Sequence, residues 1–273
     1  MAEKTGPMAA IVETFKTVFW ALLIAGVFRT LFFQPFWIPS GSMKDTLLVG
    51  DFLFVNKMAY GYSYASCPSV PFLNLGADDF CGFAEDYDDR LFGSDPERGD
   101  IVVFRHPVTG QDFIKRLIGL PGDRIQMKDG LLYINDVAVE VEDVAPFVET
   151  MGARGDYLKC INGVVGAGAD CIKERQIETL PNGVSHSILN AGNQPQDNTQ
   201  VFTVPEGEFF FMGDNRDNST DSRFAQSGGG GGIGFVERKD LIGRADRVMF
   251  SSAGRSMLAF WTWRSDRYLK ALD

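Results

Sequence analysis

A long apolar segment near the N-terminus constrains this chain more than any other feature of its sequence. Residues 17–28 read TVFWALLIAGVF without a charge, Arg29 interrupts the run, and TLFFQPFWIP follows. Because about 20 apolar residues are needed to cross a bilayer, the segment is long enough only if Arg29 extends its guanidinium toward the interface. Trp20 and Trp37 are placed to act as interfacial anchors. The pattern therefore predicts a membrane helix over residues 17–36.

A cleaved signal peptide and a buried core helix are the two alternatives for this segment. Glu3 and Glu13 do not fit the basic start of a signal peptide, and the large residues after Phe28 do not fit its cleavage site. We therefore expect an uncleaved, single-pass anchor at 17–36 that follows a short N-terminal segment, residues 1–16. Basic residues flank both ends of the anchor, so they do not decide its orientation.

The four cysteines bear on metal binding and on the compartment. Cys67, Cys81, Cys160 and Cys171 form no C-x-x-C motif, and both histidines are distant in sequence, so we expect no metal site. Disulfides are favoured over free thiols, which places the chain beyond the anchor on an oxidising side of the membrane. Three pairings are open. The net charge of −10, without a basic stretch, also argues against nucleic acid as a partner.

The chain beyond residue 40 is typical of a mostly β protein. Short segments rich in β-branched and aromatic residues alternate with Gly, Pro and Asp. These segments are residues 51–60, 99–107, 112–120, 123–140, 201–214 and 241–250. Within 123–140, Lys128-Asp129-Gly130 predicts a hairpin turn. Polar inserts at about 61–98 and 150–200 predict a less regular subdomain beside a sheet core, and the C-terminal MLAFWTWRSDRYLKALD predicts a short amphipathic helix.

Two residues stand out as a candidate nucleophile and its base. Ser42 lies in the turn PSGSM and would need a base within hydrogen-bond reach. His106 and His186 read as surface or strand-end residues, so a Ser-His-Asp triad has little support. Lys115, in the apolar stretch FIKRLI, could accept the proton if burial lowers its pKa from about 10.4. The alternative is a lysine that faces solvent from an edge strand.

A third segment, MGDNRDNSTDSR at 212–223, concentrates polar residues directly after an apolar strand. It could be a polar turn, or it could form a buried network behind a site. The pairings that a network predicts are Asp214 with Arg116, Asp221 with Arg223, and Ser219 with Lys115.

Taken together, PSGSM at 39–43, DFIKRLIGLPGD at 112–123 and GDNRDNSTDSR at 213–223 resemble three sequence boxes of bacterial type I signal peptidases, in the same order. These are membrane-bound serine proteases that remove signal peptides from exported proteins. GDFLFVNK, RGDIVVFRHP and GFVERKDLIGRA match weaker boxes. The resemblance covers residues 17 to about 250 apart from the inserts.

The resemblance implies a fold and a set of site residues. The fold is a mostly antiparallel β core with a variable β subdomain, anchored by one N-terminal helix. Ser42 matches the nucleophile, Lys115 the general base, and the Ser40 hydroxyl with the Ser42 N–H the oxyanion hole. The supporting positions are Ser219, Asp214, Arg116, Asp221 and Arg223, and those at the substrate pockets are Phe36, Ile38, Met43, Leu47 and Ile114.

The resemblance also implies where the protein acts and on what. It places residues 37–273 as a catalytic domain on the periplasmic side of the bacterial inner membrane, with residues 1–16 in the cytoplasm. The expected partners are preproteins with Ala-x-Ala cleavage sites and the lipid bilayer, with export machinery as a further contact to test, and no cofactor is expected. A protease dedicated to few substrates and a non-catalytic, membrane-anchored binding protein stay open as alternatives.

The sequence departs from the family pattern at three places. Asp45 stands where the family usually has proline, a pentaglycine at 228–232 replaces a firmer loop, and the first cysteine-bearing insert is longer than usual.

Overall fold

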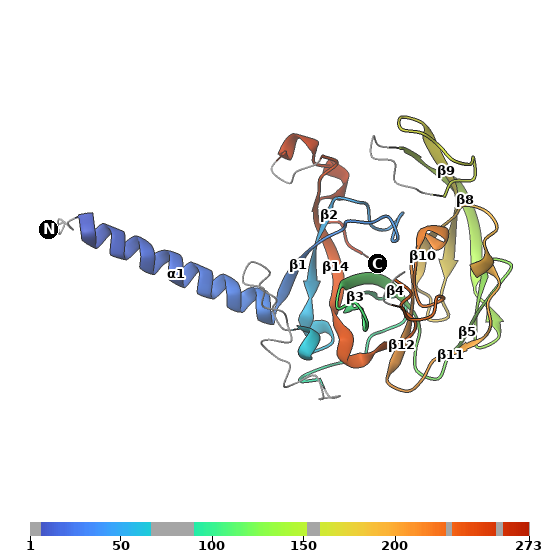
Figure 1. Ribbon diagram of the computed structural model, residues 1–273, viewed down its shortest axis with the longest axis horizontal. Coiled ribbons are helices and arrows are strands. Elements are labelled where there is room, and N and C mark those ends of the chain that lie inside the picture. The colour runs from blue at the N-terminus through green and yellow to red at the C-terminus, as the bar shows by residue number, and fades with distance from the viewer. Residues whose placement is uncertain (1–6, 67–89, 152–158, 228–230, 255–258, 273) are drawn as a thin grey trace.

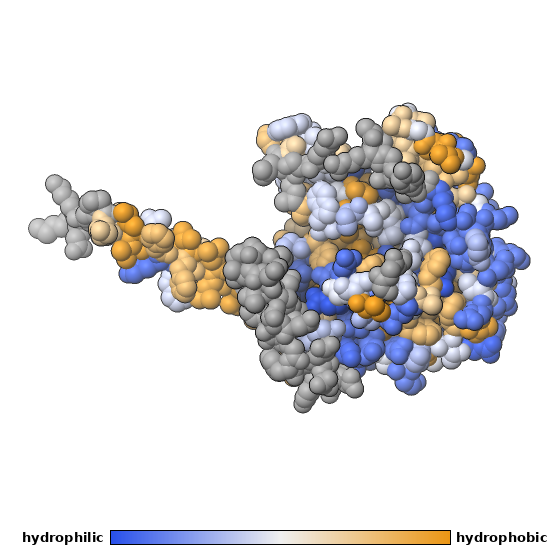
Figure 2. Space-filling view, viewed as in Figure 1, coloured by the Kyte–Doolittle hydropathy of each residue, from blue (hydrophilic) through white to orange (hydrophobic). Residues whose placement is uncertain are grey.

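The N-terminal helix projects from a body built of β-sheets (Figure 1). The computed structural model describes residues 7–66, 90–151, 159–227, 231–254 and 259–272. Helix α1 is Pro7–Leu31, and its segment Met8–Phe28 is long and apolar enough to cross a membrane, with a mean hydropathy of 1.7. Apolar side chains run along its exposed surface (Figure 2). The helix therefore fits a membrane anchor by length and composition.

The helix begins and ends earlier in the chain than predicted. It begins at Pro7 rather than at residue 17, and Phe33–Trp37 forms strand β1 instead of continuing the anchor. Proline suits the first turn of a helix, whereas Pro35 lacks the N–H that a helix interior requires. Glu13 and Lys16 lie within the helix, exposed, where the ammonium lies 3.7 Å from the carboxylate.

The body is mostly β, as predicted, and every strand pairing within its sheets is antiparallel. The largest sheet has seven strands in the order β1-β2-β14-β3-β4-β12-β13. Their bounds are Phe33–Trp37 (β1), Asp51–Asn56 (β2), Ile101–Arg105 (β3), Asp112–Gly119 (β4), Glu208–Met212 (β12), Val236–Glu237 (β13) and Leu241–Ser251 (β14). Strand β4 lies inside this sheet, so its residues from Ile114 onward are buried on both faces.

A second sheet of four strands, in the order β11-β5-β6-β7, lies beside the first. Its strands are Arg124–Lys128 (β5), Leu131–Ile134 (β6), Val137–Ala138 (β7) and Phe202–Thr203 (β11). The predicted hairpin is confirmed, because β5 pairs with β6 across Asp129 and Gly130. Both turn residues have positive φ, 49° and 79°, which is the geometry of a type I′ turn.

The third sheet shows that the second insert is more regular than predicted. It has the order β10-β9-β8 and consists of Glu140–Thr150 (β8), Asp170–Thr179 (β9) and Ser185–Asn190 (β10). The variable β subdomain is confirmed, and it is more regular over Asp170–Thr179 and Ser185–Asn190 than the polar composition of the insert predicts, because exposed charged residues such as Glu174 mask the strand pattern. Most of the first insert, residues 67–89, lies outside the described residues. We call β8, β9 and β10 the insert sheet.

Short 3-10 helices account for the remaining elements. They are Lys57–Ala59 (η1), Tyr64–Ser66 (η2), Pro195–Asp197 (η5), Arg216–Asn218 (η6), Arg238–Asp240 (η7), Phe260–Thr262 (η8) and Ser265–Arg267 (η9). The predicted C-terminal amphipathic helix is wrong, since described residues 259–272 contain only η8 and η9. The ring of Trp263 instead stacks on Phe250, with centroids 4.5 Å apart.

One of the expected disulfides is present. Cys160 and Cys171 are bonded, with their Cα atoms 5.4 Å apart. Their side chains pack in a small buried cluster with Met151 beside the insert sheet. Cys67 and Cys81 lie outside the described residues.

Candidate active site

The turn that carries Ser42 follows β1, and an asparagine from a distant segment binds its backbone. The backbone N–H of Asn215 donates to the Ser42 carbonyl at 3.0 Å, and its side-chain Nδ2 donates to the Gly41 carbonyl at 2.7 Å. Asn215 is fully buried. It therefore fixes both carbonyls next to the Ser42 hydroxyl. Its position in GDN was visible in the sequence, but nothing distinguished it from an ordinary turn asparagine.

Lys115 lies against Ser42. Its Nζ donates to Ser42 Oγ at 2.7 Å and to the Ile114 carbonyl at 3.0 Å. The side chain is buried because β4 is an inner strand, and burial lowers the lysine pKa to about 8, while Asp221 and Asp214 act in the opposite direction. A fraction of this lysine is therefore neutral near pH 7 and can accept a proton from the Ser42 hydroxyl.

Neither histidine is a surface residue, which corrects part of our expectation. His106 does follow the end of β3, but it is buried and its Nδ1 accepts the N–H groups of Val108 and Thr109. His186 lies buried within β10, with Nε2 3.4 Å from a Glu178 oxygen. Burial lowers its pKa to about 4. Among the described residues, no histidine forms a hydrogen bond with Ser42.

Two buried ion pairs lie behind the lysine. Arg116 donates from Nε and Nη2 to both oxygens of Asp214, at 2.9 and 2.8 Å, and Arg223 binds Asp221 at 2.9 and 3.0 Å. Burial alone would raise the pKa of both carboxyl groups, but the paired guanidinium groups lower it. Asp221 also accepts the Gly213 N–H at 3.1 Å. Both carboxylates are therefore ionised and in place to influence Lys115.

Ser219 lies beside the same segment, and Gly213 explains how closely it packs. A Cβ atom added at Gly213 would lie 2.2 Å from Ser219 Oγ and 2.6 Å from the Ser42 carbonyl oxygen. Only glycine allows this approach. The buried Ser219 hydroxyl helps to lower the pKa of Asp221, yet it has no well-formed hydrogen bond to any described residue, Lys115 included.

A groove of about 450 Å³ gives access to the Ser42–Lys115 pair. Phe36 and Ile114, two of the five predicted pocket residues, line it. The other three, Ile38, Met43 and Leu47, are fully buried in the core cluster below the Ser42 turn. The Ser40 hydroxyl lies at the groove 3.5 Å from Ser42 Oγ, so a hydroxyl donor stands next to the nucleophile candidate.

The comparisons with known proteins agree on one family. A model of the family described as signal peptidase, peptidase S26 matches residues 11–250. The chain is 37% identical over 258 residues to a signal peptidase I of Rickettsia typhi, covering 92% of this chain and 84% of the relative. It is 39% identical over 248 residues to a signal peptidase I of Rickettsia prowazekii, covering 88% and 80%.

A solved structure is also similar to part of the chain. It is the crystal structure of a signal peptidase I from Enterococcus faecalis V583, 29% identical, and the match covers 55% of this chain and 97% of that one. The TM-score of this match is 0.29.

Proposed function

Because the chain belongs to the signal peptidase S26 family, we propose that it is a membrane-anchored serine endopeptidase that removes signal peptides from exported preproteins. The observation that carries the mechanism is the 2.7 Å hydrogen bond from Lys115 Nζ to Ser42 Oγ. Ser42 is then the nucleophile and Lys115 its general base. The curated relatives are signal peptidases I, and the chain covers most of their length.

The first half of the proposed reaction forms an acyl-enzyme. Neutral Lys115 takes the proton of the Ser42 hydroxyl while Oγ bonds to the scissile carbonyl carbon. The oxyanion is stabilised by the Ser42 N–H and the Ser40 hydroxyl. The lysine then returns its proton to the leaving amine, and the peptide C–N bond breaks.

In the second half, Lys115 takes a proton from water, which attacks the Ser42 ester. Collapse of the second tetrahedral species returns that proton to Ser42 Oγ and releases the signal peptide. The ion pairs of Asp214 with Arg116 and of Asp221 with Arg223 hold the lysine in place, and we propose that Ser219 contributes to its orientation. The protons in this mechanism move only among Ser42, Lys115, water and the leaving amine.

The groove supports a preference for small residues before the cut. Phe36 and Ile114 line it on the side of Ser42, and we propose that these apolar walls accept the small residues of Ala-x-Ala sites. Ile38, Met43 and Leu47 form the packed floor below, so we propose that they limit pocket depth from beneath.

The helix and the disulfide support a location. Strand β1 follows α1 almost directly, so the Ser42 turn stays close to the end of the anchor. The Cys160–Cys171 disulfide favours an oxidising compartment. We propose that residues 37–273 form the periplasmic catalytic domain of an inner-membrane protein, in contact with the bilayer and with preproteins, while export machinery is a further partner to test.

Cleavage of a purified preprotein tests this function. The full chain in detergent should cut a preprotein with an Ala-x-Ala site, mass spectrometry should place the cut after the second Ala, and Ser42→Ala should abolish it. A matched preprotein with a bulky residue in place of that Ala should resist. If the folded wild type cuts neither, the protein is a dedicated protease or a binding protein.

A further inference from the structure

We propose that the insert sheet positions the nucleophile through Lys44 and Asp45, which makes Glu149 and Arg175 positioning residues for Ser42. This inference rests on the proposed function, because it assigns to two residues of the insert sheet a part in the same reaction. Neither residue touches the groove that would hold the substrate. Glu149 contacts the side chain of Lys44 and Arg175 that of Asp45, two and three residues after Ser42.

Lys44 connects the Ser42 turn to strand β8. Its side chain is buried, and its ammonium donates to Glu149 Oε2 at 2.5 Å. The same side chain folds back over the residue before the nucleophile, because a Cβ atom added at Gly41 would lie 3.2 Å from Lys44 Cε. The backbone N–H of Lys44 also donates to the Gly41 carbonyl at 3.2 Å. A shift of the Glu149 carboxylate would therefore move Lys44 and, through it, displace Gly41 and Ser42.

Asp45 makes the second connection. Its Oδ2 accepts from Arg175 Nη1 at 3.4 Å on β9 and from Ser187 Oγ at 3.2 Å on β10. Arg175 is itself fixed, since its Nε donates to the Ala145 carbonyl at 2.9 Å. These contacts restrain Asp45 through its side chain.

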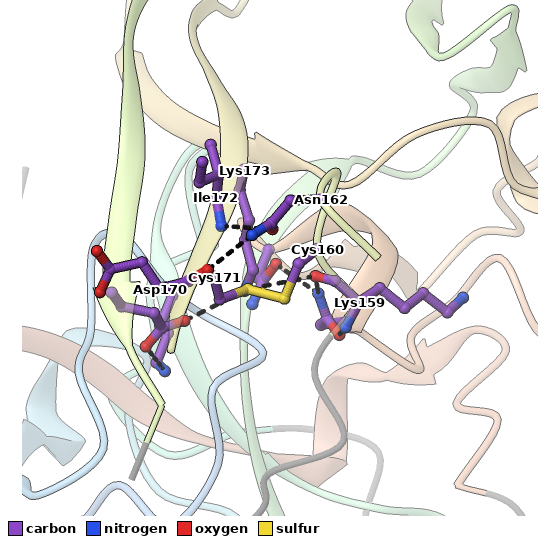
Figure 3. The surroundings of a disulfide bond; sticks show 11 residues. Lys159, Cys160, Asn162, Asp170, Cys171, Ile172 and Lys173 are labelled. Carbon is purple, nitrogen blue, oxygen red and sulfur yellow. Dashed lines mark hydrogen bonds and ion pairs between the residues drawn. A yellow bond between two sulfur atoms is a disulfide. The ribbon is translucent and has the colours of Figure 1, made fainter. Parts of the chain in front are cut away.

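Glu149 is held in place by the strand next to it. It lies opposite Cys171 in the β8–β9 register, and Lys173 places its fully buried ammonium 3.4 Å from the second Glu149 oxygen. Cys171 is bonded to Cys160, and Figure 3 shows Lys173 following this disulfide along β9. The disulfide therefore braces the end of the insert sheet that binds Lys44.

These contacts complete the support of the nucleophile turn from a second side. Asn215 holds the Gly41 and Ser42 carbonyls from the segment that also carries Asp214, and the Glu149 pair holds Lys44 from the insert sheet. A displacement of about 1 Å at a reacting group can reduce a rate about 100-fold. Loss of the Glu149 carboxylate should therefore lower kcat without changing how the preprotein binds.

A double-mutant cycle tests the proposal on the full chain in detergent. The variants are Lys44→Met, Glu149→Gln and their combination, with Glu142→Gln, an exposed carboxylate of the same strand, as the matched control. We expect each single change to lower kcat about tenfold and to leave KM within twofold. The combination should lower kcat no further, since either change alone removes the ion pair, and Glu142→Gln should match the wild type.

Three results would each overturn the proposal. They are additive losses in the combination, an increase in KM with unchanged kcat, and full activity of Glu149→Gln. Unfolding temperatures show whether a variant is folded, and Arg175→Gln with its conservative partner Arg175→Lys gives an independent case in which the lysine should restore kcat in part. A wild type that fails to cut the preprotein would refute the proposed function itself. Equal activity of the wild type and all variants would instead refute only the positioning role of Glu149 and Arg175.

Discussion

The Nζ atom of Lys115 donates a 2.7 Å hydrogen bond to the Oγ atom of Ser42, a residue 73 positions earlier in the chain. The two residues meet because the turn after β1 lies over the inner strand β4. Burial of the lysine follows from the sheet order, and burial is also what makes the lysine a usable base. The fold therefore sets both the geometry and the protonation state of the proposed catalytic pair.

Burial of Lys115 should cost stability. At pH 7 the lysine is mostly protonated in both the folded and the unfolded states, and a folded pKa of about 8 against 10.5 for a free lysine means that charging the buried amine is unfavourable. Lys115→Met should therefore raise the free energy of unfolding at pH 7 by up to about 3 kcal/mol. Urea unfolding measures this.

The same comparison has a defined pH dependence. Between pH 8 and 10.5 folding releases the lysine proton, so the wild type gains stability as the pH rises, and the advantage of Lys115→Met should disappear near pH 10.5. A Met variant that is less stable than the wild type at pH 7 would contradict the account.

Ser40 should contribute to the rate through its hydroxyl. Removal of one oxyanion donor typically lowers kcat about 100- to 1000-fold, so Ser40→Ala should lower kcat by that order with little change in KM. Ser40→Thr keeps a hydroxyl and serves as the matched control. Steady-state kinetics of preprotein cleavage measure kcat and KM for both variants. Equal activity of the alanine and threonine variants would show that the Ser40 hydroxyl has no part in the mechanism.

Asp221 should affect both stability and the pH profile. Asp221→Asn leaves Arg223 buried without its counter-ion, which typically costs about 3–5 kcal/mol of unfolding free energy. Because Asp221 raises the pKa of Lys115, its removal should also shift the acidic limb of kcat/KM to lower pH. The partly exposed Asp246, which pairs with Arg244, is a control whose change to Asn should cost about 1 kcal/mol or less. A limb that moves to higher pH would contradict the assigned role.

The Cys160–Cys171 disulfide should contribute to stability and to the rate. It closes a loop of sequence separation 11, for which chain entropy predicts about 3 kcal/mol. The double change Cys160→Ser and Cys171→Ser should lower the unfolding free energy by that order and reduce kcat as Glu149→Gln does. Applied to Glu149→Gln, the double change should lower kcat no further. If this double change alone leaves kcat unchanged, the disulfide does not support the site.

The local signals of the sequence predicted most strands of the large sheet, whereas the pairing of Ser42 with Lys115 followed from the family resemblance. Apolar, β-branched segments predict strands because the pleat alternates side chains between faces. The motif order placed Ser42, Lys115 and the Asp214 segment in one family pattern. Tertiary structure then decided what these signals left open, such as the burial of His186 and the two carbonyl contacts of Asn215.

The missed features have specific physical causes. Exposed charges obscure the strands of the insert sheet in the sequence. The apolar residues of β1 continue the hydrophobic run of α1, so the sequence predicts an anchor that ends too late in the chain. The C-terminal aromatics resembled an amphipathic helix, whereas Trp263 packs on Phe250. Contacts across the fold, such as Lys44 with Glu149, leave no local trace in the sequence.

The pH dependence of preprotein cleavage tests the central claim, that neutral Lys115 is the base for Ser42. Below a pKa of about 8, kcat/KM should rise about tenfold per pH unit and then level off, because only the neutral amine accepts the serine proton. Lys115→Met should be inactive throughout. A wild-type profile that is flat from pH 5 to 9, or cleavage that persists in Lys115→Met, would contradict the account.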